Sequence, residues 1–334
     1  MLSKEKIKTL AERVNECWQK KITFPGNCAW ERSCYMLGNL AAYDITGNEE
    51  YIKYAVKWAD ANNRAFFVDT ENGMDYGNDL LCGEIYFRLK DIGMGDVSES
   101  VLEIMQKSLD DIHNDYWWWI DAIYMALPFF QQMGIRYGDS RYFDKAYRVY
   151  SNARNERRLY DKDEHLWFRD ENYLPENKLE ANGRKIFWGR GNGWVFAGIA
   201  RALDTMDSDN SYYSAYSKDL RDMAEALKNV QNENGSYCVS FFDKETYPYH
   251  ESSSTVLITL GYFVGLRLGV LDDKYFETAK KGFDWLTNTA LKDSGFIGYA
   301  QDIAGWPSHK VDENLSKDYV VGTYLLILKE LYNL

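Results

Sequence analysis

Apolar residues recur along most of this chain at the spacing of a helix. Leu10, Val14 and Trp18, for example, repeat every four residues behind Ser3, a residue type that caps helices well. The same period continues toward the C-terminus and predicts about twelve helices. We expect them near residues 3–18, 30–43, 51–62, 78–89, 98–112, 118–133, 139–155, 191–206, 212–230, 251–268, 272–288 and 317–332.

Strand signals are few and short, the best being the segments 236–241 and 295–299. No Gly-, Pro- or Ser-rich linker divides the chain, and its charges do not segregate, so we predict a single domain over residues 1–334. The segments 156–190 and 290–316 are long and irregular. Long ordered loops on a rigid scaffold usually carry function, so we expect both to cover one end of the fold.

Several helices follow one another after short turns, as from Gly134 to Asp139 and from Gly269 to Asp272. Short links favour antiparallel pairs. Twelve helices paired in this way either stack as an open solenoid or close into a barrel of six hairpins. A solenoid should show a fixed sequence period, and this chain shows none. We therefore predict an all-α fold, the (α/α)6 barrel.

The composition is that of a folded, acidic protein rich in aromatic residues. Its net charge is −12 and 46% of its residues are hydrophobic, which is enough for a large core and excludes a disordered chain. The acidic balance argues against binding to nucleic acid or to an anionic membrane. Aromatic residues make up 16% of the chain. They either fill a bulky core or stack on sugar rings in a cleft, and composition leaves both interpretations open.

The five cysteines and four histidines show no metal-binding pattern. The cysteines are widely spaced and form no CxxC pair, which predicts free thiols, and the histidines stand singly. We expect neither a metal nor an organic cofactor. The polar start MLSKEK lacks an apolar leader, and no apolar run reaches the length of a membrane span. The expected location is the cytoplasm, or the periplasm if a leader has been removed.

The most unusual segment is WWWIDAIYMALP, which begins at Trp117. Asp121 is its only charge, and on a helix Met125 and Pro128 would share its face. A carboxylate in so apolar a setting should have a raised pKa, as a general acid working near neutral pH requires. The alternative is that Asp121 merely caps a helix, and this segment alone does not decide between the two.

A second carboxylate, Asp79, lies in the segment YGNDLLCGE and has no basic neighbour before Arg88. It either caps a helix or faces Asp121. If the two carboxylates face each other, each raises the pKa of the other, and one holds a proton near neutral pH.

The segment WGRGNGW, from Trp188 to Trp194, combines small residues with two aromatic faces. Glycines let a backbone approach a ligand closely, and Arg190 offers a planar fork suited to a carboxylate. No GK[ST] follows, so this is not a phosphate loop. The alternative is a tight turn with Arg190 packed on tryptophan. The run HESSST, which contains Glu251, opens another helix and either caps it or contributes to a site.

Together these segments resemble the unsaturated rhamnogalacturonyl hydrolases, family 105 of the glycoside hydrolases, which are similar to the unsaturated glucuronyl hydrolases of family 88. The resemblance covers nearly the whole chain and is most specific in WWIDAIYMA and WGRGNGW. Supporting matches are Asp79 followed by GEIY, ESS at Glu251, RLG at Arg267, and VGTYLL near the C-terminus.

The resemblance implies an (α/α)6 barrel and a glycosidase that acts on an acidic oligosaccharide. Its substrate would carry a 4,5-unsaturated galacturonic or glucuronic acid at the non-reducing end, as polysaccharide lyases leave it. The family reaction hydrates the vinyl ether double bond and does not displace at the anomeric carbon. The neighbouring sugar and the oligomeric state are not given by the sequence.

By resemblance, Asp121 is the general acid/base that protonates C4 and assists water at C5, and Asp79 is the second carboxylate. The pocket-lining positions of the family correspond to Met125, Trp188, Arg190 and Trp194. We further expect four residues to bind substrate: Arg169, Glu251, Gln301 and Trp306.

The chain departs from the family pattern at three positions. Arg169 stands about where the family has a histidine, Glu84 replaces a glutamine, and Leu127 replaces a proline. His165 is the nearest substitute for the missing histidine. Because the net charge repels an acidic sugar, capture must depend on local positive charge. We expect that charge first from Arg190 and then from Arg169, for which a solvated loop position is the alternative.

Two other function classes remain open from the sequence. A sugar epimerase on the same barrel would need histidines that converge on the barrel end, and none of the four stands in a repeated helix motif. A sugar-binding barrel without catalysis would keep the aromatic cleft but would give the isolated Asp121 no purpose.

Overall fold

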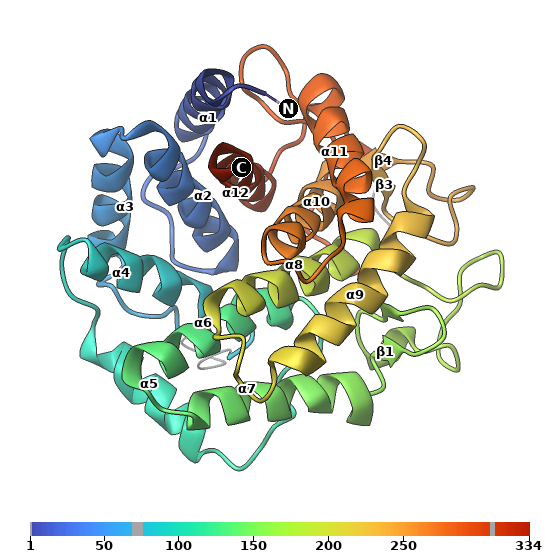
Figure 1. Cartoon of the computed structure of the whole chain (residues 1–334), viewed down its shortest axis with the longest axis horizontal. Coiled ribbons are helices and arrows are strands. Elements are labelled where there is room, and N and C mark those ends of the chain that lie inside the picture. Colours follow the sequence, from blue (N-terminus) through green and yellow to red (C-terminus); the bar gives the residue numbers. More distant parts are fainter. Residues whose placement is uncertain (1, 69–75, 308–310) are drawn as a thin grey trace.

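Twelve α-helices dominate the residues that the computed structural model describes, which are 2–68, 76–307 and 311–334. They form two concentric rings around one axis (Figure 1). The inner ring consists of α2 (Trp30–Thr46), α4 (Leu81–Asp91), α6 (Ala122–Tyr137), α8 (Gly189–Thr205), α10 (Ser252–Arg267) and α12 (Asp318–Asn333). The outer ring consists of α1 (Lys4–Gln19), α3 (Glu49–Ala61), α5 (Glu99–Asp110), α7 (Arg141–Ser151), α9 (Tyr213–Val230) and α11 (Phe276–Trp285). This is the predicted (α/α)6 barrel.

The inner ring closes because neighbouring helices approach through glycines and apolar side chains. Each inner helix packs on the next, and α12 packs back on α2. A Cβ on Gly38 of α2 would come within 2.4 Å of the backbone of Gly322 in α12, and one on Gly198 of α8 within 2.8 Å of the backbone of Tyr124 in α6. Larger residues at these glycines would push the helices apart. Helix α10 is buried on nearly every side, which explains why its sequence is apolar all round.

The outer helices are amphipathic, and this is the pattern from which the sequence predicts helices. In α7 the buried side chains include Tyr142, Ala146, Val149 and Tyr150, at the i, i+4, i+7 and i+8 positions of one face. Their opposite faces meet solvent. No helix within the described ranges combines the length and the apolar content that crossing a bilayer requires.

The helix ends confirm some of the predicted signals and correct others. The Ser3 side chain caps α1, and Gly47 ends α2 with φ of 70°, a left-handed conformation that glycine adopts without strain. The helix expected over 272–288 is divided. It begins as the 3-10 helix Asp273–Tyr275, a frequent form at helix ends, and ends as the π-helix Leu286–Ala290, a rarer form.

Only very short strands occur in the described ranges. They form three antiparallel pairs: β1 (Tyr160–Asp161) with β2 (Leu166–Trp167), β3 (Tyr237–Cys238) with β4 (His250–Glu251), and β5 (Ala300–Gln301) with β6 (Val311–Asp312). The strand expected over 236–241 is thus shorter than predicted. The strand expected over 295–299 is wrong: within it only Ile297 forms a bridge, to Leu291 across a turn, and the paired strand begins just after it.

All six inner helices run in the same direction, so their N-termini gather at one end of the barrel, which we call the mouth. The connections at the far end are short, such as 47–48 and 138–140. The connections that arrive at the mouth are longer, including 152–188 and 286–317. Apart from residues 308–310, which lie outside the described ranges, the two irregular segments therefore belong to the connections at the mouth, as predicted.

Candidate functional site

Asp121 lies at the mouth, immediately before the first residue of α6. Its backbone is already helical and its carbonyl accepts from the N–H of Tyr124 at 3.1 Å, but its side chain forms no capping hydrogen bond. Its Oδ1 atom is buried and has no hydrogen-bond partner within the described part of the chain. An acidic oxygen left in this state is free to act on a ligand, and the structure offers no support for a pure capping role.

The electrostatic surroundings keep Asp121 available as a proton donor. Burial raises its pKa to about 6, because the charged form loses hydration. The positive charges of Arg169 and Arg190 act against this shift, and the negative charge of Asp170 adds to it. A carboxyl group with this pKa carries a proton for a large part of the time in slightly acidic solution, which suits a general acid.

The backbone around Asp121 is fixed by a second segment. The N–H of Ile120 donates to the carbonyl of Arg169 at 3.1 Å, and Trp119 forms an antiparallel bridge with Asp170. These contacts join the loop that carries Arg169 and Asp170 to the residues that precede α6. This pairing sets the position of Asp121 relative to the guanidinium.

Asp79 is buried, 6% exposed, in the segment that precedes α4. That segment lies against the one that carries Asp121. A Cβ on Gly77 would come within 2.6 Å of the Trp119 indole and 3.0 Å of the Ala122 methyl group, so glycine is required for this approach. The structure thus brings together the two chain segments that hold the predicted carboxylates. Direct pairing of Asp79 with Asp121 stays a prediction.

Arg169 lies between an acid and an aromatic face. Its guanidinium forms an ion pair with the buried Asp170 and stacks over the indole of Trp118, with 5.1 Å from Cζ to the ring centroid. The Arg169 side chain is 22% exposed, and its Nε has no hydrogen-bond partner in the described residues. Gly305 passes close enough that a Cβ there would lie 3.1 Å from the guanidinium. This arginine is held in place, with its unpaired Nε buried near Gly305, and a purely solvated loop position is excluded.

Asp170 belongs to the site although its sequence position did not predict it. Its carboxylate is 2% exposed, holds Arg169 and accepts from the N–H of Asn172 at 2.8 Å. Its place directly after Arg169 was visible in the sequence. Nothing in the spacing, however, distinguishes it from the many other acids of this chain.

Glu31, in the first turn of α2, was missed as well. Burial raises its pKa, and Lys317 and Arg190 lie near enough to lower it.

Arg190 does not have the free guanidinium that the sequence suggested. It is 2% exposed. Its Nη1 donates to the carbonyls of Gln301 (2.9 Å) and Asp302 (3.1 Å) and to the hydroxyl of Tyr319 (2.9 Å). Its Nη2 donates to the carbonyls of Asp302 (3.1 Å) and Ala304 (2.9 Å). The expectation that Arg190 forks onto a substrate carboxylate is therefore corrected: both terminal nitrogens hold the 301–304 loop, and its charge acts on Asp121.

Several other predicted binding residues are buried and support this loop. Trp188 is 1% exposed and donates from Nε1 to Oε1 of Gln301 at 2.9 Å. Gln301 in turn donates from Nε2 to the carbonyl of Trp306 at 3.0 Å. The Trp306 side chain itself remains 42% exposed at the mouth. The structure thus keeps Trp306 as a candidate contact and places Trp188 and Gln301 behind it.

Met125, Trp194 and Glu251 are also enclosed by protein. Met125 and Trp194 are each 1% exposed, and the Trp194 ring packs on Tyr124 with 4.7 Å between centroids. Glu251 is fully buried, and its carboxylate accepts from the N–H groups of Ser253 and Ser254, which makes it the N-cap of α10. The expectation of direct substrate contact is therefore corrected for Glu251, since capping occupies both oxygens.

Glu84, which departs from the family pattern, and His165, the nearest substitute for the missing histidine, both have structural partners. Glu84 faces Arg201 of α8 inside the barrel at 2.5 Å, so the acid in place of glutamine is neutralised by a cation. His165 hydrogen-bonds through Nδ1 to the Tyr160 hydroxyl at 2.8 Å. It lies in the β1–β2 hairpin and lines a cavity that does not include Asp121. His165 therefore does not replace the missing histidine at the mouth.

The direction of the inner helices compensates for the acidic net charge at this place. Each helix carries a partial positive charge at its N-terminus, and all six of these ends lie at the mouth. Arg169 and Arg190 add two full charges. An anionic ligand is therefore attracted locally by a protein whose total charge is −12. Within the described ranges, no cluster of three or more His, Cys, Asp or Glu residues forms a metal site.

Comparisons with known proteins agree with this geometry. A family model described as Glycosyl Hydrolase Family 88 matches residues 3–334. The unsaturated 3S-rhamnoglycuronyl hydrolase of Formosa agariphila is 28% identical over 331 residues, which cover 91% of this chain and 84% of that protein. The structure of a glycosyl hydrolase family 88 protein from Bacteroides vulgatus superposes with a TM-score of 0.91 at 27% identity, covering 99% of both chains. A structure described as a polysaccharide lyase gives a TM-score of 0.90 at 27% identity, covering 99% of this chain and 98% of that one.

Proposed function

Since this chain belongs to Glycosyl Hydrolase Family 88, we propose that Asp121 is the general acid of its reaction. The chain is a glycosidase that acts on oligosaccharides carrying an unsaturated uronic acid. The observation that carries the proposal is the state of the Asp121 carboxyl group. It lies at the mouth, its Oδ1 is buried without a partner, and burial raises its pKa to about 6.

The proposed reaction needs one proton and one water molecule. Protonated Asp121 delivers its proton to C4 of the double bond, and positive charge develops at C5 and the ring oxygen. The ionised carboxylate then takes a proton from a water molecule as the oxygen of that water adds to C5. The resulting hemiketal opens and releases the remaining sugar, and Asp121 is protonated again. Asp79 is proposed to assist as the second carboxylate of the mouth.

We propose that the sugar next to the unsaturated uronate is a rhamnose. The support is that relatives from Formosa agariphila and an Alteromonas species are both unsaturated 3S-rhamnoglycuronyl hydrolases, and that of Bacillus subtilis is an unsaturated rhamnogalacturonyl hydrolase. Arg169 is proposed to bind an acidic group of this substrate, because its positively charged side chain is partly exposed beside Asp121. The exposed indole of Trp118, beside it, offers a face for the sugar ring.

The test compares Asp121→Asn with wild type on lyase-digested pectin, arabinogalactan, glycosaminoglycan and ulvan. The readout is loss of the ultraviolet absorbance of the conjugated double bond. The amide keeps the shape of the side chain but cannot deliver a proton, so we expect turnover to fall about 10²–10⁴-fold. Asp115→Asn is the matched control, because this nearby aspartate is exposed. Near-normal turnover by Asp121→Asn would overturn the assignment.

The same assay separates hydrolysis from lyase activity, which the similarity to a described polysaccharide lyase makes worth measuring. A hydrolase of this kind consumes conjugated double bonds, whereas a lyase creates them. We expect absorbance to fall on pre-digested substrates and to stay constant on intact polysaccharides. A rise in absorbance on an intact polysaccharide would contradict the proposal.

A further inference from the structure

The first turn of α8 contains a fully buried amide, that of Asn192, which binds the backbone of a distant segment. Its Oδ1 accepts from the N–H of Trp167 at 2.8 Å, and its Nδ2 donates to the carbonyl of the same residue at 3.0 Å. Nδ2 also donates to the carbonyl of Trp188 at 3.1 Å. Both N–H groups are thus engaged inside the protein, so Asn192 has no donor left for a substrate and acts only through the residues that it binds.

The amide of Asn192 takes the place of a neighbouring strand beside β2. Trp167 of β2 lies opposite Tyr160 of β1. The neighbouring hydrogen bond between the strands runs from the N–H of Phe168 to the carbonyl of Leu159 at 2.8 Å. Successive residues of a strand direct their hydrogen-bonding groups to opposite sides, so the N–H and carbonyl of Trp167 point away from β1. A primary amide both donates and accepts there, whereas an ionised carboxylate of the same shape can only accept.

The strand that Asn192 binds leads directly into the partly exposed arginine of the mouth. Arg169 follows Trp167 by two residues, and its carbonyl accepts from the N–H of Ile120 at 3.1 Å. Ile120 is the residue before Asp121. A shift of Trp167 would therefore pass along the backbone to Arg169 and change its position relative to the carboxyl group of Asp121.

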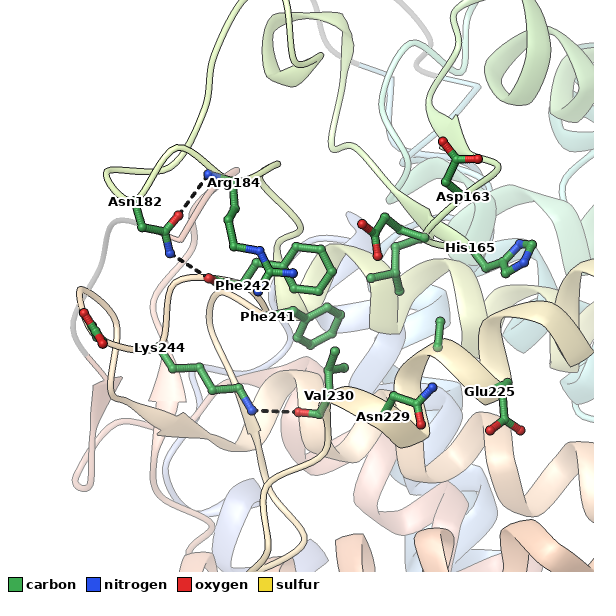
Figure 2. Close-up of a pocket in the computed structure, with 14 residues that line it drawn as sticks. Asp163, His165, Asn182, Arg184, Glu225, Asn229, Val230, Phe241, Phe242 and Lys244 are labelled. Atoms are coloured by element: carbon green, nitrogen blue, oxygen red, sulfur yellow. Dashed lines mark hydrogen bonds between the residues drawn. The ribbon is translucent and has the colours of Figure 1, made fainter.

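On the outer side of the β1–β2 hairpin, an open cavity takes the place of packed protein. The cavity has a volume of about 760 Å³, and Asp163 and His165 at the tip of the hairpin line it (Figure 2). The Trp167 ring packs on Tyr150 of α7, with 5.6 Å between centroids, whereas the Trp167 backbone is hydrogen-bonded to the barrel through Asn192. Because solvent in the cavity cannot hold the hairpin, loss of the amide should let β2 shift.

Two polar residues of one helical turn thus hold the two segments that meet at the mouth. Arg190 binds the 301–304 loop, and Asn192 binds β2. Gly305, just after that loop, lies against the Arg169 guanidinium, into which β2 leads. The polar residues of the WGRGNGW segment therefore support the mouth and do not line it.

We propose that Asn192 is a positioning residue: by holding β2, it fixes Arg169 where its positive charge captures the acidic substrate. The inference rests on the proposed function for the role of Arg169. Since Asn192 is buried with both N–H groups bound, any effect of its replacement on catalysis must pass through the segment that it holds.

The first test is Asn192→Asp, a change that keeps the shape of the side chain but replaces its two N–H donors by an oxygen. The carbonyls of Trp167 and Trp188 then face an acceptor, and β2 should leave its place. Hydrogen–deuterium exchange of peptides measures this directly. We expect exchange to become about fivefold faster over 166–170 and 118–121. Unchanged exchange in both peptides would overturn the proposal, whatever the kinetics show.

Asn39→Asp is the matched control, because it removes the same kind of donor elsewhere in the core. Asn39 is a fully buried residue of α2 whose Nδ2 donates to the carbonyl of Tyr51 in α3 at 2.7 Å. We expect this variant to lose stability as well, but to show normal exchange over 166–170 and 118–121 and a normal KM. If Asn192→Asp does not fold, Asn192→Ser replaces it, since the shorter hydroxyl cannot bridge both backbone groups and adds no charge.

The second test is a double-mutant cycle with Arg169→Gln, which separates positioning from a general loss of structure. In the wild-type background, Asn192→Asp should raise KM for an unsaturated uronide about fivefold. In the Arg169→Gln background the same change should leave KM almost unaltered, because the group that it positions is absent. Equal fold-changes in both backgrounds would overturn the proposal. If Arg169→Gln alone left KM unchanged, the proposed role of Arg169 and the capture part of this inference would both fail, and raised exchange would distinguish that result from a failure of Asn192 to hold β2.

Discussion

Two arginines act on Asp121, and the regions around them differ in what they leave free. Around Arg190 the protein is closed: the terminal nitrogens of the guanidinium are bound to carbonyls and a tyrosine hydroxyl, and the side chain is 2% exposed. Around Arg169 it is partly open: one acid holds the guanidinium, and the side chain is 22% exposed. Both lower the pKa of Asp121. The role of an arginine flanked by aromatic residues therefore depends on its surroundings. It supports a loop where protein acceptors bind its N–H groups, and it can serve a ligand where part of its side chain stays exposed.

The largest effect is expected from breaking the closed region. Arg190→Lys keeps the charge but loses the planar fork, so several loop carbonyls lose their donor in a buried place. We expect the free energy of unfolding to fall by about 2–4 kcal/mol. Chemical denaturation monitored by tryptophan fluorescence measures this.

Tyr319→Phe is the matched control for that variant. It removes one partner of Arg190 and one hydrogen bond to Gln301, so we expect a smaller loss of about 1 kcal/mol. If Arg190→Lys were as stable as wild type and only its KM rose, the guanidinium would be serving substrate, and the distinction between the two regions would fail.

A smaller effect, and on a different quantity, is expected from the open region. Arg169→Gln removes the positive charge of this partly exposed side chain while the helices remain in place. We expect KM for an unsaturated uronide to rise about tenfold, equivalent to about 1.4 kcal/mol. The free energy of unfolding should fall as well, because the buried Asp170 loses its cation. Steady-state kinetics beside the denaturation curve of the same variant checks both parts. Equal kinetics for wild type and variant across the substrate panel would show that Arg169 does not bind substrate.

The smallest effect concerns the pH dependence and sharpens the role of Asp170. Activity requires protonated Asp121, so kcat should fall as pH rises through the pKa of about 6. Asp170→Asn removes a negative charge that raises this pKa, so the falling limb should move to lower pH. Arg169→Gln removes a positive charge that lowers it, so the limb should move to higher pH. Profiles of kcat against pH that shift in the same direction for both variants would contradict the electrostatic picture.

The fold follows from local information, whereas the site follows only in part. Each helix carries its own apolar period in the sequence, so the twelve helices and their pairing were predictable. The apolar run around Asp121 also marked this carboxylate as unusual. The partners of Arg190 were not predictable, because Gln301 and Tyr319 lie far along the chain and come near only after the barrel closes. Asp170 was not predicted because its importance comes from its ion pair with Arg169. The spacing of residues along the sequence does not show which acids form such a pair.

The separation of short connections at the far end from long connections at the mouth has a consequence for how this architecture can change. Closing a longer surface loop costs free energy that grows only with the logarithm of its length. Insertions between an outer helix and the next inner helix therefore leave the glycine contacts of the inner ring untouched. The barrel can therefore stay constant while the connections at the mouth change in length and sequence. Proteins that descend from one ancestral sequence can then come to prefer different saccharides without any change in the residues of the core.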